Sequence, residues 1–262
     1  MNTLWLIGCG NMAGTMLSRW LATGMDADRV TVIDPAATRS DVRVLASVPD
    51  EAPPMLLMLG VKPQMLGDVA PGLQAAAKGA LLLSILAGTT TATLAETFPR
   101  ARAVLRVMPN LPVAIGKGVV GLHGTLTPED RAAANALMAP LGLVEWIADE
   151  AHFDAVTALS GSWPAFVYRF IDALAQGGAA MGLPADQAAR LALATVEGAG
   201  LLAAASDASP AGLADKVASQ GGSTRKGLDV LDADDALVRL ATAALKAAEQ
   251  RNREMAAFMR SG

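Results

Sequence analysis

A glycine-rich segment near the start of the chain combines the residue types and the spacing that bind phosphate groups. Its sequence is Gly8-Cys9-Gly10-Asn11-Met12-Ala13, between a short apolar run and a helical pattern. In a G-x-G-x-x-A turn, the first glycine allows the tight bend, the second admits a pyrophosphate, and the small alanine lets the helix approach the strand. The N–H groups at the start of that helix then bind phosphate. The segment therefore predicts a dinucleotide-binding site.

Asp34 lies at the end of the next apolar run, where a side chain distinguishes NADH from NADPH. A carboxylate there accepts hydrogen bonds from the ribose hydroxyls and repels a 2′-phosphate, which favours NADH. Two alternatives stay open. Arg39, in the following loop, could instead meet a phosphate, and Asp34 could be only a turn residue before Pro35. The sequence thus predicts NADH or NADPH as cofactor, with a lean to NADH.

A second glycine-containing segment, far along the chain, has the residue types of another anion site. It runs Ser219-Gln220-Gly221-Gly222-Ser223-Thr224, and its glycines separate two helical patterns. Successive N–H groups at a helix N-terminus suit a carboxylate. Ser223 and Thr224 are also common helix caps, so a purely structural interpretation stays open.

The elements that must position both segments follow from the hydrophobic pattern. Over residues 1–149, short apolar runs alternate with helical patterns, which predicts βαβ units and a mostly parallel, doubly wound sheet. The expected strands are residues 4–7, 30–33, 55–59, 80–86, 103–107, 119–122 and 143–147. From residue 150 onward only helical patterns follow, at 150–159, 164–181, 184–205, 210–218, 224–231 and 234–260. The predicted fold is an α/β Rossmann domain over residues 1–149, followed by an all-α domain over residues 150–262.

The helical patterns of the C-terminal part are rich in alanine and poor in charge, above all over residues 173–205. A long apolar helix pair with few charges needs a partner surface. We therefore expect an all-α dimerisation domain. The alternative is that these helices only form the core of their own domain.

Composition limits the classes of function. The 262 residues are 52% hydrophobic and carry a net charge of −4, which gives no attraction to nucleic acid or to an anionic membrane. One cysteine and no recognisable secretory signal fit a reducing compartment, so we expect a cytoplasmic protein. Neither His123 nor His152 stands at metal-ligand spacing, so no metal site is expected.

Four further segments are distinctive as an ordered set: Val61-Lys62-Pro63-Gln64, Ser84-Ile85-Leu86-Ala87-Gly88, Arg106-Val107-Met108-Pro109-Asn110-Leu111-Pro112 and Ala158-Leu159-Ser160-Gly161-Ser162-Trp163-Pro164-Ala165. Together with the two glycine-containing segments, they resemble the pyrroline-5-carboxylate reductase family over essentially the whole chain. The resemblance implies a Rossmann domain and a helical domain that interlocks two subunits, with larger rings of dimers in many members. It also implies NAD(P)H-dependent reduction of L-1-pyrroline-5-carboxylate to L-proline, the last step of proline biosynthesis.

The resemblance also implies roles for individual residues. Those expected at the cofactor are Ile7, Gly8, Cys9, Gly10, Asn11, Met12, Asp34, Gly60, Val61, Lys62, Pro63, Met108 and Asn110. Those expected at the substrate are Gly221, Gly222, Ser223 and Thr224, with Thr224 and Ser219 as catalytic residues and Asp207 and Lys216 as less securely aligned polar contacts. Lys62 could instead be a solvated loop lysine, and Met108 an ordinary core residue.

The expected reaction is direct hydride transfer to the imine carbon, C5, with the substrate's carboxylate held by the amides of residues 222–224 and the Thr224 hydroxyl bonded to the imine nitrogen. Two residues depart from the family pattern. Trp163 stands where a small residue is usual, and Gln220 stands where proline is common, and both bear on substrate range. Two rival functions stay open: reduction of a different cyclic imine on the same scaffold, and a non-catalytic dinucleotide-binding regulatory dimer.

Overall fold

The protein is described by a computed structural model that covers residues 3–261, with side chains as far as Glu254. The chain divides into two compact units, each described by itself below. The first unit contains Met1–Ser162 and Ala248–Gly262, and the second contains Trp163–Ala247. This division differs from the predicted boundary after residue 149. Residues 150–162 belong with the first unit because Phe153 is buried there and Glu150 pairs with Arg106.

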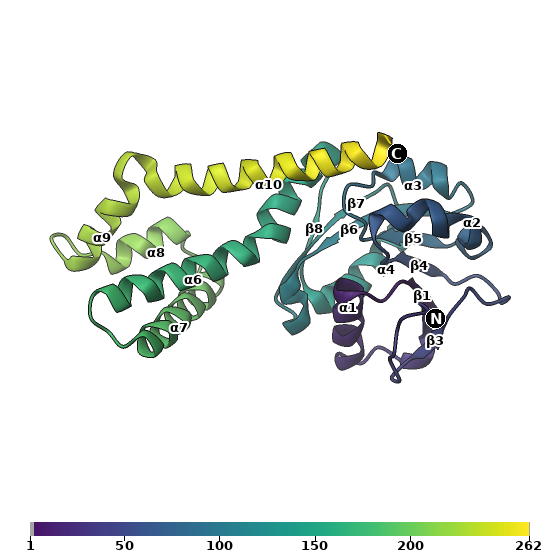
Figure 1. Cartoon of the computed structure of the whole chain (residues 1–262), viewed down its shortest axis with the longest axis horizontal. Helices are drawn as coiled ribbons and strands as arrows, with labels where there is room; N and C mark the ends of the chain where they lie inside the picture. The colour runs from purple at the N-terminus through teal and green to yellow at the C-terminus, as the bar shows by residue number, and fades with distance from the viewer. Residues whose placement is uncertain (1–2, 262) are drawn as a thin grey trace. The chain divides into compact units, whose positions relative to one another are not determined.

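The first unit is built on one eight-stranded sheet of order β3-β2-β1-β4-β5-β6-β7-β8 (Figure 1). Only the β6–β7 pair is antiparallel, so the predicted mostly parallel, doubly wound sheet is confirmed. The chain order reverses between β1 and β4, and ligands of such sheets bind at this switch point, beyond the carboxyl ends of the strands. The strands are β1 Leu4–Ile7, β2 Val30–Ile33, β3 Arg43–Leu45, β4 Leu56–Leu59, β5 Leu81–Ser84, β6 Ala103–Pro109, β7 Gly118–His123 and β8 Gly142–Trp146.

Helices cover both faces of this sheet, because successive strand residues point to opposite sides. Leu6 of β1 packs with Trp20 of α1 and Leu137 of α4 on one face, whereas Trp5 packs with Leu73 of α2 on the other. The Trp20 indole Nε1 also donates to the Leu137 carbonyl at 2.7 Å, which ties α1 to α4. The helical segments of the first unit are α1 Asn11–Ala22, η1 Ala27–Arg29, η2 Pro63–Met65, α2 Leu66–Ala77, α3 Thr91–Thr97, η3 Leu111–Ile115, α4 Pro128–Met138, η4 Ala139–Leu141, η5 Glu150–His152, α5 Phe153–Val156 and the π-helical η6 Thr157–Ser162.

The second unit is entirely helical. Its segments are α6 Trp163–Ala180, α7 Ala185–Ala204, α8 Pro210–Val217, α9 Ser223–Asp232, η7 Ala233–Asp235 and the first part of α10 Ala236–Ser261. Helices α6 and α7 pack against each other, yet the only buried residues in them are Ala188 and Ala192. Large apolar side chains are exposed instead, among them Phe170, Leu193, Leu202 and Val238. So much uncovered apolar surface indicates an interface with another chain.

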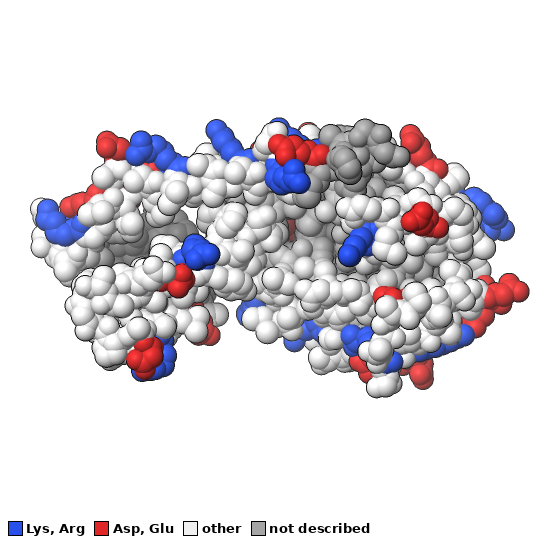
Figure 2. All heavy atoms as spheres, in the orientation of Figure 1, with Lys and Arg blue, Asp and Glu red and all other residues white. Residues whose placement is uncertain are grey.

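Among the residues that the structure describes, no helix is long and apolar enough to cross a membrane. On the face drawn in Figure 2, positive and negative side chains are interspersed over the surface. This mixed pattern agrees with the small net charge of −4.

Candidate functional site

The predicted phosphate-binding turn lies between β1 and α1. Gly8 has a φ of +81°, and a Cβ there would stand 2.9 Å from the Val61 backbone nitrogen. The turn after β4 approaches equally closely, since a Cβ on Gly60 would stand 2.7 Å from the Gly8 carbonyl oxygen and 2.8 Å from the Ala13 Cβ. These close approaches explain why the sequence has glycine at both strand ends and a small residue in the helix.

Gly10 differs from Gly8 because nothing in the described chain crowds it. No atom lies within 4 Å of the position of a Cβ on Gly10, and its φ of −65° is open to any residue. Gly10 is the N-cap of α1 and makes no side-chain cap hydrogen bond, so the first N–H groups of this helix point to an exposed surface. A dinucleotide pyrophosphate fits here, because it needs both the uncapped N–H groups and the room that a side chain would fill.

Asp34 shapes this turn directly. Its carboxylate oxygens accept hydrogen bonds from the Cys9 N–H at 2.8 Å and from the Ala36 N–H at 2.9 Å. The predicted ribose-binding residue therefore also fixes the backbone of the phosphate loop. Burial raises the pKa of the Cys9 thiol, which keeps it protonated and agrees with a packing role for this side chain.

Arg39 comes from the loop after β2 and reaches the same turn. One guanidinium nitrogen, Nη1, donates to the Gly14 carbonyl at 3.2 Å and to the Ser18 hydroxyl at 3.0 Å, while Nε donates to Asp41 at 2.9 Å. Together with Cys9, Gly10 and Asn11, Arg39 lines a pocket of about 690 Å³. A half-buried cation, paired with Asp41, therefore lines the same pocket as the predicted phosphate loop, and its contact with a cofactor phosphate stays a prediction.

The other predicted cofactor residues lie beyond the end of β4 and at the end of β6. Pro63 and Met108 line a second pocket of about 600 Å³, with Gly88 of the loop after β5. Met108 is 9% exposed, so it belongs both to the pocket wall and to the core. The Lys62 residue is exposed, and its backbone carbonyl accepts a hydrogen bond from the Met65 N–H at 2.9 Å. The exposure agrees with a solvated loop lysine.

Asn110 is buried at the end of β6 and has structural partners. Its Nδ2 donates to the Ser160 carbonyl at 2.9 Å, and its Oδ1 accepts from the Val119 N–H at 2.8 Å. The amide thus joins the end of β6 to the start of β7 and to η6. This arrangement explains an asparagine in the Met108-Pro109-Asn110 segment, while a direct contact of Asn110 with cofactor stays a prediction.

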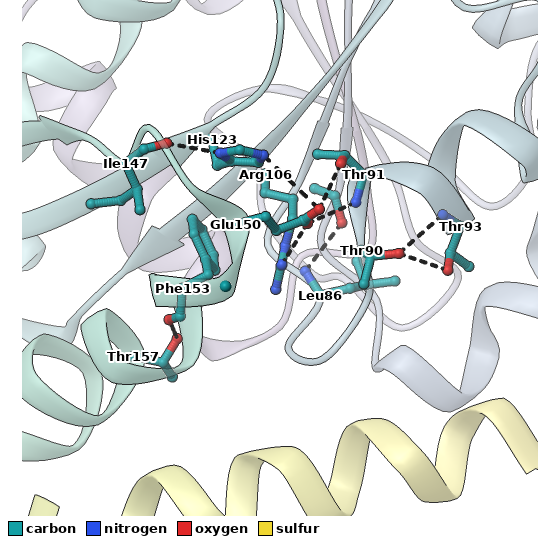
Figure 3. Close-up of polar contacts among 12 residues, drawn as sticks. Leu86, Thr90, Thr91, Thr93, Arg106, His123, Ile147, Glu150, Phe153 and Thr157 are labelled. Atoms are coloured by element: carbon teal, nitrogen blue, oxygen red, sulfur yellow. Dashed lines mark hydrogen bonds and ion pairs between the residues drawn. The ribbon is translucent and has the colours of Figure 1, made fainter.

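A partly buried ion pair, whose two members line a further pocket of about 450 Å³, was not predicted from the sequence (Figure 3). Arg106 of β6, whose side chain is 6% exposed, donates to Glu150 Oε1 at 2.7 Å and lies 4.1 Å over the Phe153 ring. Glu150 also accepts from the Thr91 N–H at 2.9 Å and from its hydroxyl at 2.8 Å. His123 Nε2 lies 3.9 Å from Glu150 Oε2.

This Arg106–Glu150 network joins β6, the start of α3 and η5. Its Arg106 lies two residues before Met108 in β6. Burial raises the pKa of Glu150, but hydrogen bonds from Thr91 and Arg106 outweigh that effect and hold the pKa below its ordinary value. The carboxylate is therefore ionised near neutral pH. No local motif announces such a pair, since its members are far apart in sequence.

The predicted substrate loop lies in the second unit, at the start of α9. Gly221 has a φ of +75°, and Gly222 is the N-cap, with no side-chain cap hydrogen bond. A Cβ on Gly222 would stand 2.6 Å from Ser219 Oγ. Ser223 and Thr224 lie in the first turn rather than at the N-cap, and both are exposed. The capping interpretation of these two hydroxyls is therefore wrong, and the first N–H groups of α9 point to an accessible surface.

Trp163 and Gln220, the two residues that depart from the family pattern, have ordinary surroundings in the structure. Trp163 stacks edge-to-face on Phe166, one turn later in α6, with ring centroids 5.4 Å apart. Gln220 is exposed in the loop before Gly221. The Ser160-Gly161-Ser162 segment, which precedes Trp163, forms the end of a π-helical turn. Within the second unit nothing in the structure explains why an indole replaces a small residue at 163.

The sheet order and the open phosphate loop define a dinucleotide-binding protein of the Rossmann class. Residues 150–255 match the pyrroline-5-carboxylate reductase dimerisation family, and residues 3–88 match the family of coenzyme F420-dependent NADP oxidoreductases. The pyrroline-5-carboxylate reductase of Pseudomonas aeruginosa is 34% identical over 95% of both chains. That of Pisum sativum is 37% identical over 97% of this chain and 96% of its own.

Solved structures give the same assignment. A pyrroline-5-carboxylate reductase from Coxiella burnetii superposes with a TM-score of 0.87 and 27% identity, covering 97% of this chain and 98% of its own. The Plasmodium falciparum pyrroline carboxylate reductase with NADP bound superposes with a TM-score of 0.84 and 25% identity, with the same coverage. The chain belongs to the pyrroline-5-carboxylate reductase family, and the resemblance found in the sequence is confirmed. Its C-terminal part is that family's dimerisation domain, which supports oligomer formation.

Proposed function

We propose that this protein reduces L-1-pyrroline-5-carboxylate to L-proline with NADH or NADPH, as the last step of proline biosynthesis. Family membership over nearly the whole chain supports this activity. The observation that carries it is the pair of glycine-containing bends. Each precedes a helix whose N-terminus has no side-chain cap, so each offers free N–H groups to an anion.

The first bend would hold the dinucleotide. The N–H groups of Asn11 and Met12 would bind the pyrophosphate, Gly10 would leave it room, and Ile7 and Gly8 would set the turn. Val61, Pro63 and Met108 would line the nicotinamide end. When bound, the reduced nicotinamide supplies the hydride. The protein contributes orientation and the exclusion of water.

The second bend would hold the substrate. The N–H groups of residues 222–224 would bind its carboxylate, and the small Gly222 would leave room beside Ser219. The Thr224 hydroxyl would hydrogen-bond the imine nitrogen, which becomes a neutral amine. No strong acid is needed, because a protonated imine is already electrophilic.

The cofactor preference follows from two residues with opposite effects. Asp34 favours NADH, because its carboxylate repels a 2′-phosphate, and each of its oxygens keeps a lone pair after binding one backbone N–H. Arg39 at the same pocket is now paired with Asp41, and it would bind the phosphate by exchanging part of that ion pair for the new contact. We therefore propose that both dinucleotides bind, with NADH preferred and with Arg39 as the residue that permits NADPH.

We also propose a homodimer formed through the helices of the second unit, with a larger ring of dimers as a further assembly. The exposed apolar side chains of α6, α7 and α10 support the dimer. A cytoplasmic location fits the reduced state expected of Cys9. The proposed substrate is a small molecule, and no nucleic-acid or membrane partner is proposed.

An absorbance assay of NADH and NADPH oxidation tests the activity. We expect turnover with pyrroline-5-carboxylate to exceed turnover with its six-membered homologue and with pyrroline-2-carboxylate. A preference for either alternative would assign a different cyclic imine, and binding of cofactor without oxidation by any imine would favour the regulatory dimer. Thr224→Ala should lower kcat by about ten-fold or more and leave cofactor affinity intact, whereas Thr224→Ser should retain most activity. Unchanged kcat in Thr224→Ala would remove Thr224 from the mechanism.

A further inference from the structure

The C-terminal end of α10 belongs to the first unit and lines the second pocket there. Arg251, Asn252 and Glu254 form part of the wall of this pocket of about 600 Å³, together with Pro63 and Met108. Nothing in the sequence had placed the last helix near the cofactor. The pocket is therefore lined in part by α10, which the predicted cofactor site did not include.

Asn252 is the unusual member of that wall. Its Nδ2 is buried and has no hydrogen-bond partner, and among the described residues it is the only buried side-chain nitrogen or oxygen in that condition. Buried donors nearly always have an acceptor, because losing water without a replacement is costly. A donor left in this state on a pocket wall indicates that a ligand supplies the acceptor.

The position in the fold identifies which end of a dinucleotide would lie here. Asp34 and Arg39, beyond β2, mark the adenosine side of the switch point between β1 and β4. The second pocket lies on the opposite side, beyond β4, β5 and β6, with Pro63, Gly88 and Met108 in its wall. A dinucleotide that crosses the switch point with its pyrophosphate at Gly10 would reach this pocket with its nicotinamide end.

The charges of the pocket lining indicate which chemical group of a ligand would bind next to Asn252. Asp154 and Glu254 are acidic, and the one basic residue of the wall, Arg251, already donates to Glu254 at 3.0 Å. This balance disfavours an anionic group such as the substrate's carboxylate and suits a neutral amide. An asparagine amide also matches a carboxamide, since each offers one carbonyl and one NH₂ group.

We propose that Asn252 is a nicotinamide-binding residue whose Nδ2 donates a hydrogen bond to the carboxamide oxygen of the bound cofactor. The last helix thereby orients the nicotinamide ring within its own subunit. This inference rests on the proposed function only in requiring a bound nicotinamide dinucleotide. It requires neither a particular substrate nor a particular preference between NADH and NADPH.

Isothermal titration calorimetry on the full-length protein tests the contact without turnover. The ligands are NADH and NADPH, and their fragments without nicotinamide, ADP-ribose and 2′-phospho-ADP-ribose. Asn252→Ala and the isosteric Asn252→Asp should raise the Kd for the dinucleotides by about 3- to 10-fold. The same variants should leave the Kd for the fragments within about two-fold. Lys246→Ala, an exposed change on the same helix outside the pocket wall, should change neither.

The outcomes separate the two claims. Dinucleotide binding that is equal in wild type and Asn252 variants would overturn the role of Asn252 and leave the proposed function standing. Equal losses for dinucleotides and fragments in both variants would also overturn it, because the effect would then be structural. If the wild-type protein bound no dinucleotide at all, both the inference and the proposed function would fail.

Discussion

Removal of the Glu150 carboxylate should destabilise the first unit strongly. In Glu150→Ala, the Arg106 guanidinium, 6% exposed, loses its ion-pair partner, and both donors of Thr91 lose their acceptor. Leaving one charge of a buried pair without its partner costs about 3–5 kcal/mol of the free energy of unfolding. For a chain of this size that loss corresponds to a Tm lower by about 6–20 °C.

Thermal unfolding followed by circular dichroism, at one protein concentration, measures this loss. The matched control is Glu51→Ala, which removes an exposed Arg–Glu ion pair, the one with Arg43. Its side chains are 48% and 45% exposed, so little change is expected. The double variant Arg106→Met with Glu150→Leu should recover part of the loss, because no unpaired charge remains. A Glu150→Ala protein as stable as the Glu51→Ala control would refute the reasoning.

Three further predictions concern pH, cofactor and assembly. The folded-state pKa values of Glu150 and Asp130 lie below their ordinary values of 4.5 and 3.8. The stabilisation from each carboxylate is therefore present above the ordinary value and disappears as the pH falls through the folded pKa. The Tm of Glu150→Gln should accordingly depend less on pH below about 4.5 than the Tm of the wild type. Arg39→Ala should raise the KM for NADPH by about ten-fold or more and leave that for NADH within about two-fold, and equal effects on both would exclude a phosphate contact. Leu202→Glu places a charge on a side chain that is 63% exposed in the single chain, and light scattering should then show a lower mass than the wild type; an unchanged mass would place Leu202 outside the interface.

Local patterns in the sequence were sufficient to predict most of the first unit. The turn at Gly8 and Gly10 depends on backbone conformation and space, which residue type reveals directly. Seven strands were expected within a residue or two of their observed positions, because buried parallel strands are continuous apolar runs. The missed strand, Arg43–Leu45, has three residues at the sheet edge and no apolar run. The antiparallel direction of β7 also has no signal in the strand itself.

Contacts between distant residues were beyond the sequence. No sequence motif around Glu150 predicts its ion pair with Arg106, and none predicts the hydrogen bond from Asn110 to the Ser160 carbonyl. Asn252 lies in a charged stretch of α10 with no motif of its own, so only its placement on the pocket wall distinguishes it. The resemblance to a family predicted roles for the glycine-containing bends because family motifs preserve spacing, whereas these three residues act through tertiary contacts.

The most direct test of the account follows the hydride itself. The enzyme is given pyrroline-5-carboxylate and reduced cofactor with deuterium on both C4 positions, and the product is examined by mass spectrometry and NMR. We predict L-proline that carries one deuterium atom, at C5. Proline without deuterium at C5, or cofactor oxidation without any proline, would contradict the claim that this protein transfers hydride to the imine carbon.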